Sequence, residues 1–196
     1  MAMTEITEAR PAEDHRSRWI GVYVGVLATL LAICTMGGGN ATKDATRSNI
    51  EAANTWAFFQ AKNTRRTVLA VAADDLDLLL KATPAMPADA RKAVEDKIKS
   101  YRADIVRFTS DKEKNEGLDE LWAKAREVEA ERDVALRKDP YFDLGQALLQ
   151  IAIVLASVAL IASADFLIYM SVVLGITGTL MMLNGFILFA KLPFLG

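Results

Sequence analysis

Three long segments without a charged residue, with a charge-dense stretch between the first and the second, constrain this sequence more than any other feature. The segments are Trp19–Met36, Leu144–Ala164 and Phe166–Ala190, which hold 18, 21 and 25 residues. A helix rises 1.5 Å per residue, so about 20 apolar residues span the ~30 Å hydrocarbon core of a membrane. The sequence therefore predicts an all-α membrane protein with three transmembrane helices.

The first segment has a competing interpretation as a removable export signal. The apolar core of such a signal is usually only ~7–15 residues long and ends in small residues, which "CTMGGGNA" provides. The length of Trp19–Met36 and the position of Trp19 at its edge favour a permanent anchor.

The last two apolar segments are separated by Asp165 alone. Together they are too long for one crossing, so Asp165 marks a predicted tight turn and is available to cap the final helix. Lys191 and Pro193 are expected to end that helix. The predicted division of the chain is a charged tail (1–18), a membrane helix (19–36), an extramembrane hairpin (37–140), two membrane helices (144–164 and 166–190) and a tail (191–196).

Small residues recur in each apolar segment at alternating steps of four and three, which places them on one face of a helix. The residues are Gly21, Gly25, Ala28 and Ala32, then Ala152, Ala156, Ala159 and Ser163, then Ser171, Gly175 and Gly178. Lipid gives helices no hydrophobic reason to associate, so small residues that allow close backbone approach mark packing faces. Three such faces predict an intramembrane bundle and a homo-oligomer.

No ionisable residue lies within the three segments, whereas proton relays, voltage sensors and ion-coupled carriers usually have one there. The notable polar residues at depth are Gln146, Gln150, Thr177 and Asn184. We expect hydrogen bonds between helices from them. Pore lining by Thr177 and Asn184 along an oligomer axis is the alternative.

The charged middle has a helical composition, rich in Ala, Leu, Glu, Lys and Arg. The helical pattern is interrupted most clearly by "TPAMP" at Thr83–Pro87. At the other end, "GGGN" at Gly37–Asn40 is expected to be the joint where the membrane helix ends. The middle therefore predicts a long, coiled-coil-like helical hairpin with arms 41–82 and 88–138.

Each arm carries an apolar repeat that suits such packing. The second arm has Val94, Ile98, Tyr101, Ile105 and Phe108, and after a polar break near Lys112–Gly117 it resumes with Leu118, Leu121, Ala125 and Val128. The first arm has Ile50, Ala57, Thr64, Val71 and Leu78 at steps of seven. Trp56, Phe58 and Phe59 are expected to pack in the hairpin, with a membrane-interface belt or a partner contact as the alternatives.

Several classes of function lack the residues they need. With one histidine (His15) and one cysteine (Cys34) within an apolar segment, neither a Ser/His/Asp or Cys/His triad nor a zinc site can be assembled, so no enzyme, metal or cofactor is expected. The acidic "ADDLD" run lacks the ligand spacing of a calcium loop. A net charge of −2 does not favour nucleic acid.

The chain resembles the bacterial domain-of-unknown-function 4337 family. The resemblance rests on Trp19-Ile20 at the start of the first membrane helix, on "GGGNATKDATRSNIEAANTWAFFQAK" after it, and on the C-terminal helix pair. "WAFFQAK" is its most specific part. The resemblance implies a bacterial inner-membrane protein and brings no activity, catalytic residue or cofactor.

Sidedness is predicted from basic residues, which favour the cytoplasm. Arg16 and Arg18 adjoin the first helix and place the N-terminus in the cytoplasm and the hairpin in the periplasm. Basic residues at the membrane ends of the hairpin and in the C-terminal tail favour the opposite orientation: Lys43, Arg47, Arg132, Arg137, Lys138 and Lys191. In the family that the chain resembles, the turn between the last two helices is often basic, which implies that this turn and the N-terminus lie in the cytoplasm. Asp165 departs from that pattern.

The sequence thus predicts a non-enzymatic, multi-pass membrane protein that acts as an oligomeric scaffold or docking module through its hairpin. The expected partners are membrane lipids, further copies of the chain, and another membrane or periplasmic protein. A channel or transport-accessory component with a pore along the oligomer axis is the alternative function.

Overall fold

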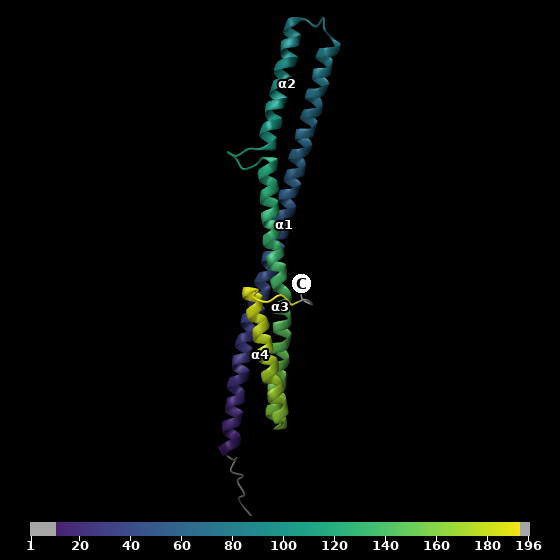
Figure 1. Ribbon diagram of the computed structural model, residues 1–196. Helices are drawn as coiled ribbons and strands as arrows, with labels where there is room; N and C mark the ends of the chain where they lie inside the picture. Colours follow the sequence, from purple (N-terminus) through teal and green to yellow (C-terminus); the bar gives the residue numbers. More distant parts are fainter. Residues whose placement is uncertain (1–10, 193–196) are drawn as a thin grey trace, which may run out of the picture. The chain divides into compact units, whose positions relative to one another are not determined.

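The computed structural model describes residues 11–192, with side chains from residue 16 onward, and the regular secondary structure of this range is α-helix. The helices are α1 (Pro11–Ala82), α2 (Ala88–Thr109), α3 (Leu118–Ala162) and α4 (Asp165–Ile187) (Figure 1). No strand occurs within the described range, which confirms the all-α class. The side chain of His15, residues 1–10 of the predicted N-terminal tail and residues 193–196 of the C-terminal tail lie outside the described residues.

Three helices of the described chain, α1, α3 and α4, are long and apolar enough to cross a membrane by length and composition. Each of these helices contains all or most of one of the three uncharged segments of the sequence. The chain is therefore compatible with a multi-pass membrane protein, as its sequence predicts.

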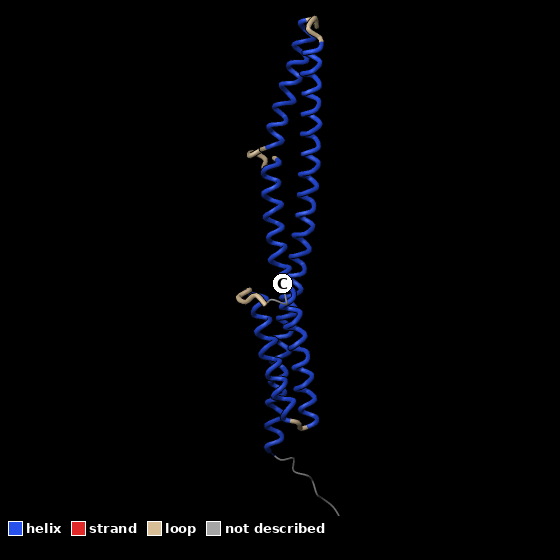
Figure 2. The backbone as a smooth tube through the Cα atoms, turned by 45° about the vertical axis from the view of Figure 1, so that its right-hand side comes forward, coloured by secondary structure: helices blue, strands red, loops and turns tan. Residues whose placement is uncertain are grey.

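The chain divides into two compact units, each described by itself. The apolar unit contains α1 up to Ala45, α3 from Asp133 onward, and α4. The charged unit is Thr46–Arg132 and contains the rest of α1, α2 and the start of α3. Loops interrupt the helices at the α1–α2, α2–α3 and α3–α4 connections (Figure 2).

In the apolar unit, α4 and the apolar parts of α1 and α3 pack around a small core. Its buried members include Leu27, Cys34, Phe142, Leu149 and Met182. The Sγ of Cys34 lies 3.3 Å from the carbonyl oxygen of Phe142, which joins α1 to α3. The core also contains the small residues Ala41 and Ala152.

The predicted joint at Gly37–Asn40 is wrong, because α1 continues through it without interruption. Glycine costs roughly 1 kcal/mol relative to alanine in a helix interior, so the packing must favour it here. A Cβ added at Gly37 would lie 2.5 Å from the ring of Phe142, and one at Gly38 would lie 3.1 Å from the Cβ of that residue. The glycines therefore make room for an aromatic ring from α3.

Asp165 begins α4 after a short turn, but its predicted capping role is wrong. The N-cap position is Ala164, which makes no side-chain hydrogen bond, and Ser163 takes a left-handed conformation at φ 53°. The Asp165 carboxylate instead accepts a 2.5 Å hydrogen bond from the Arg16 guanidinium. This ion pair joins the start of α1 to the α3–α4 turn.

In the charged unit, α1 lies beside α2 and the start of α3, and both views agree (Figures 1 and 2). The predicted second arm, 88–138, is two helices: α2 ends at Thr109, and α3 begins at Leu118 and runs on through Pro140. The polar break expected near Lys112–Gly117 is thus a loop. Ion pairs between Glu51 and Lys124, and between Asp77 and Arg102, bridge α1 to α3 and to α2.

Candidate functional site: the faces of α1

The small-residue faces predicted on the last two membrane helices are turned inward. Their buried members are Ala152, Ala156 and Ala159 on α3 and Ser171, Gly175 and Gly178 on α4. The Ser171 hydroxyl donates to the carbonyl of Ala152 over 2.6 Å and lies 3.1 Å from the hydroxyl of Tyr23. Ser163, the last predicted member on α3, is exposed in the turn.

One close backbone approach in the apolar unit includes a residue that sequence analysis missed, Gly145. A Cβ added at Gly145 would lie 3.0 Å from the carbonyl oxygen of Gly178, and one at Gly178 would lie 3.0 Å from that of Gly145. Gly145 lies on the same spacing as the predicted residues, seven before Ala152. Extension of that repeat by one heptad would have found it.

The small-residue face of α1 behaves differently, because all four predicted members are exposed. Gly21, Gly25, Ala28 and Ala32 all lie on the outer surface of the apolar unit. A Cβ added at Gly21 or Gly25 would meet no atom within 4 Å. Two of the three predicted packing faces are therefore used within the chain, and the third is not.

Of the four polar residues at depth, three form hydrogen bonds within the apolar unit, and one of these residues, Gln146, bonds to another helix. Thr35 of α1 donates to the side-chain oxygen of Gln146 of α3 over 3.3 Å, which is the expected hydrogen bond between helices. Asn184 is 1% exposed and bonds to the backbone of Ala190 through both its Nδ2 (2.8 Å) and its Oδ1 (2.9 Å). Thr177 donates to its own helix at Val173, and Gln150 is exposed.

In the charged unit, the packing face of α1 differs from the predicted one. The column predicted at steps of seven is exposed along its whole length, at Ile50, Ala57, Thr64, Val71 and Leu78. The inward positions follow steps of three and four and are buried or half-buried: Ala52, Thr55, Phe59, Lys62, Arg66, Leu69, Ala73, Leu76 and Leu80. The prediction failed because threonine, lysine and arginine occupy inward positions.

The predicted apolar residues of α2 all turn away from solvent. Ile98 is buried, and Val94, Tyr101, Ile105 and Phe108 are half-buried. At the start of α3, Leu118, Leu121, Ala125 and Val128 are buried. The aromatic cluster predicted on α1 is divided: Trp56 and Phe59 form an edge-to-face pair with ring centroids 5.5 Å apart, and Phe58 is 42% exposed.

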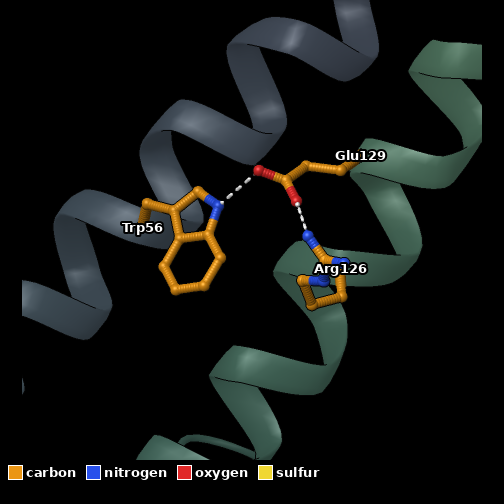
Figure 3. Close-up of polar contacts among 3 residues, drawn as sticks. All are labelled: Trp56, Arg126 and Glu129. Atoms are coloured by element: carbon orange, nitrogen blue, oxygen red, sulfur yellow. Dashed lines mark hydrogen bonds and ion pairs between the residues drawn. The ribbon is translucent and has the colours of Figure 1, made fainter.

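Trp56 also makes a polar contact across the unit (Figure 3). Its indole N–H donates to Oε1 of Glu129 on α3 over 2.9 Å, and Arg126 donates to the other carboxylate oxygen over 3.0 Å. A tryptophan N–H usually finds a partner when its ring is withdrawn from solvent. This contact accounts for Trp56 as a structural residue of the charged unit.

Lys62 is the second residue that sequence analysis missed, although it ends the "WAFFQAK" motif. It is 9% exposed, and its ammonium donates to the backbone carbonyl of Glu116. The same ammonium lies 5.4 Å from the ring centroid of Phe58 and 5.8 Å from that of Phe108, within the range of cation–π attraction. Lys62 thus links α1, α2 and the loop before α3.

The loop 110–117 is closed by Glu120. The Ser110 hydroxyl donates to Oε1 of Glu120 over 2.7 Å, and the backbone N–H of Asp111 donates to Oε2 over 3.2 Å. The hydrogen bond from Ser110 is the main reason that the pKa of Glu120 lies below its usual value. A Cβ added at Gly117 would lie 2.5 Å from the backbone nitrogen of Asp111, so the loop needs glycine there.

Comparison with known proteins identifies one family. The model of the family described as "Domain of unknown function (DUF4337)" matches residues 16–188, which include both units. No curated protein and no solved structure matches the chain.

Proposed function

The chain belongs to the DUF4337 family, a family of unknown function, and on that premise we propose a function from its own surfaces. The protein is a non-enzymatic, multi-pass protein of the bacterial inner membrane. It assembles into a homo-oligomer and serves as a structural scaffold, or docks a partner, through its charged unit.

The exposed small-residue face of α1 is the observation that carries this proposal. Small residues bring helices close enough in lipid for van der Waals contact and backbone approach, and α3 and α4 use theirs in this way. On α1, Gly25 and Ala28 have the same chemistry and spacing but are exposed. A second copy of the chain supplies the missing helix.

The charged unit is the part that acts outside the membrane. We take it as a coiled-coil-like helical hairpin, in which the three-four repeat of α1 packs on the apolar repeats of α2 and α3. Lys62 and the Trp56–Glu129 contact fix which positions meet, and they add specificity that small alanine side chains do not supply.

The proposed sidedness places the N-terminus in the cytoplasm and the charged unit in the periplasm. The ion pair between Arg16 and Asp165 puts the α3–α4 turn at the same end of the apolar unit as the start of α1, which agrees with three successive crossings. Arg16 and Arg18 adjoin the first crossing and supply the orientation signal.

The channel alternative gains no support from the residues that suggested it. Asn184 is occupied by the backbone of Ala190, and Thr177 by that of Val173. These contacts leave neither side chain available to line a pore.

Energy transfer between donor- and acceptor-labelled copies, reconstituted into liposomes at low protein density, tests self-association. Gly25→Leu with Ala28→Leu adds bulk where no neighbour of the same chain stands, so the fold should persist and the transfer efficiency should fall at least severalfold. The matched control, Val22→Leu with Thr29→Leu, adds bulk at other exposed positions of the same helix and should retain the wild-type efficiency. The proposal would be overturned if the transfer efficiency between wild-type copies were no higher than that between proteins that do not interact.

A further inference from the structure

The outer face of α1 in the charged unit is unlike the surface of a solvated helix. Exposed residues that are apolar or small recur on it, first at a step of seven and then at alternating steps of four and three: Ile50, Ala57, Ala61, Thr64, Val68 and Val71. Ile50, Val68 and Val71 are 56%, 60% and 56% exposed. We name these six residues and Asn54, which fills the remaining step, the neutral face.

The charged residues of this stretch of α1 lie outside the neutral face. Between Asn49 and Val71 the charged residues are Glu51, Lys62, Arg65 and Arg66. Glu51 pairs with Lys124 of α3 at 3.2 Å, Lys62 is buried, and Arg66 is half-buried. Arg65 is exposed but lies beside the neutral face, not on it, so the seven positions of the neutral face carry no charge over about 33 Å of helix. An exposed helix face in water normally carries the charges instead.

The neutral face has the spacing of a second coiled-coil seam. It is offset from the inner seam of α1 so that the two lie on nearly opposite sides of the helix. Small residues occupy its middle at Ala57 and Ala61, and larger ones occupy its ends at Ile50 and Val71. A partner helix can therefore approach closely at the centre and bury apolar side chains at both ends.

We infer that the neutral face of α1 packs against the neutral face of a second copy, in parallel and in register. The inference rests on the proposed function, because α1 also supplies the first membrane segment, and copies inserted in one orientation present α1 in one direction. Membrane anchoring also raises the local concentration of copies, which favours a second copy over a soluble partner.

The residues that flank the neutral face are compatible with self-pairing. In a parallel, in-register pair, a residue on one edge faces the partner residue five positions later. Gln60 then faces Arg65 of the other copy, a pair that forms a hydrogen bond. Asp74 faces Leu79, so no like charges meet along the edges. Asn54 faces Asn54, and a buried asparagine at such a position specifies register in coiled coils.

Self-disulfide formation tests this pairing in liposomes containing the full-length protein. Ala57→Cys and Ala61→Cys should each give a covalent dimer under mild oxidation, in more than about half of the chains, because the paired Cβ atoms lie within disulfide range. Ala123→Cys and Ala130→Cys, at exposed positions on α3, should give at least fivefold less dimer. The wild type, in which Cys34 is buried, sets the background.

A charge-insertion pair provides an independent readout. Ala57→Glu with Ala61→Glu should abolish the crosslink that Thr64→Cys otherwise forms, whereas Ala123→Glu with Ala130→Glu should leave it unchanged. Equal crosslinking at 57, 61, 123 and 130 would overturn the inference. If only these crosslinks fail while energy transfer between copies stays sensitive to Gly25→Leu, then the membrane contact stands and the neutral face is not an interface. If the transfer is also absent, the proposed function itself fails.

Discussion

The two units of this protein bring helices together by different means. In the apolar unit, α3 and α4 approach until the carbonyl of Gly145 and the backbone of Gly178 nearly touch. In the charged unit, α1 meets α2 and α3 through larger side chains and polar contacts such as Trp56 to Glu129. In lipid, burial of apolar surface does not drive helices together, so their association depends on close backbone contact. In water, apolar burial and polar pairing together stabilise helix packing.

The largest loss of stability is expected when bulk is added where α3 and α4 approach closely in the apolar unit. Gly178→Leu should cost about 3 kcal/mol or more and prevent α3 and α4 from packing, because its Cβ alone would lie 3.0 Å from the Gly145 oxygen and from the Leu149 Cγ. Thermal unfolding in detergent measures the loss. Ala147→Leu, at an exposed position on α3, is the control and should leave the midpoint unchanged, and equal midpoints for the two variants would contradict the packing described here.

The next largest effect is expected from Lys62 in the charged unit. Lys62→Met keeps the apolar stem but removes the ammonium that bonds to Glu116 and attracts two rings, and about 1–2 kcal/mol should be lost. Hydrogen exchange in residues 110–121 should accelerate about tenfold or more. Lys92→Met, at an exposed position on α2, should not change it. A wild-type exchange rate in Lys62→Met would show that Lys62 does not stabilise the loop.

A smaller effect should follow from loss of the polar contact across the charged unit. Trp56→Phe keeps an aromatic ring but removes the N–H that donates to Glu129, and about 0.5–1.5 kcal/mol should be lost. A double-mutant cycle with Glu129→Ala isolates the pair. A coupling energy near zero would show that the contact is not energetically significant.

The smallest effect concerns the pH dependence of the loop 110–117. The pKa of Glu120 is lower in the folded protein than in the unfolded chain, so its contribution is complete above the unfolded value, near 4.5, and is lost as pH falls through the folded pKa. Hydrogen exchange in the loop should therefore accelerate on acidification in that range. Glu120→Gln should remove most of this pH dependence, and a profile that this change leaves intact would refute the assignment.

Much of the fold follows from sequence patterns that lipid and water impose separately. Uncharged runs predict the membrane segments, and the repeat through Val94 and Ile98 predicts the inward face of α2. The inward face of α1 could not be predicted in the same way, because Lys62 and Thr55 occupy it. A lysine there is tolerated because the Phe108 ring of α2 and the Glu116 carbonyl of the loop meet its ammonium, and both come from distant parts of the sequence.

The candidate surfaces were partly predictable for a related reason. Small-residue spacing predicts faces that allow close approach, but it does not say which faces the chain covers itself. Ala156 and Ala28 occupy the same kind of repeat. Ala156 is buried because α3 packs on α4, whereas Ala28 is exposed. Similarly, glycine is needed at position 37 because of the ring of Phe142, which lies far along the chain.

The mass of the complex released gently from lipid, measured by native mass spectrometry, tests self-association through α1 most directly. The account predicts an integer multiple of 21.4 kDa for the wild type and a smaller multiple for Gly25→Leu with Ala28→Leu. A wild-type mass of a single chain, unchanged by the substitutions, would contradict it.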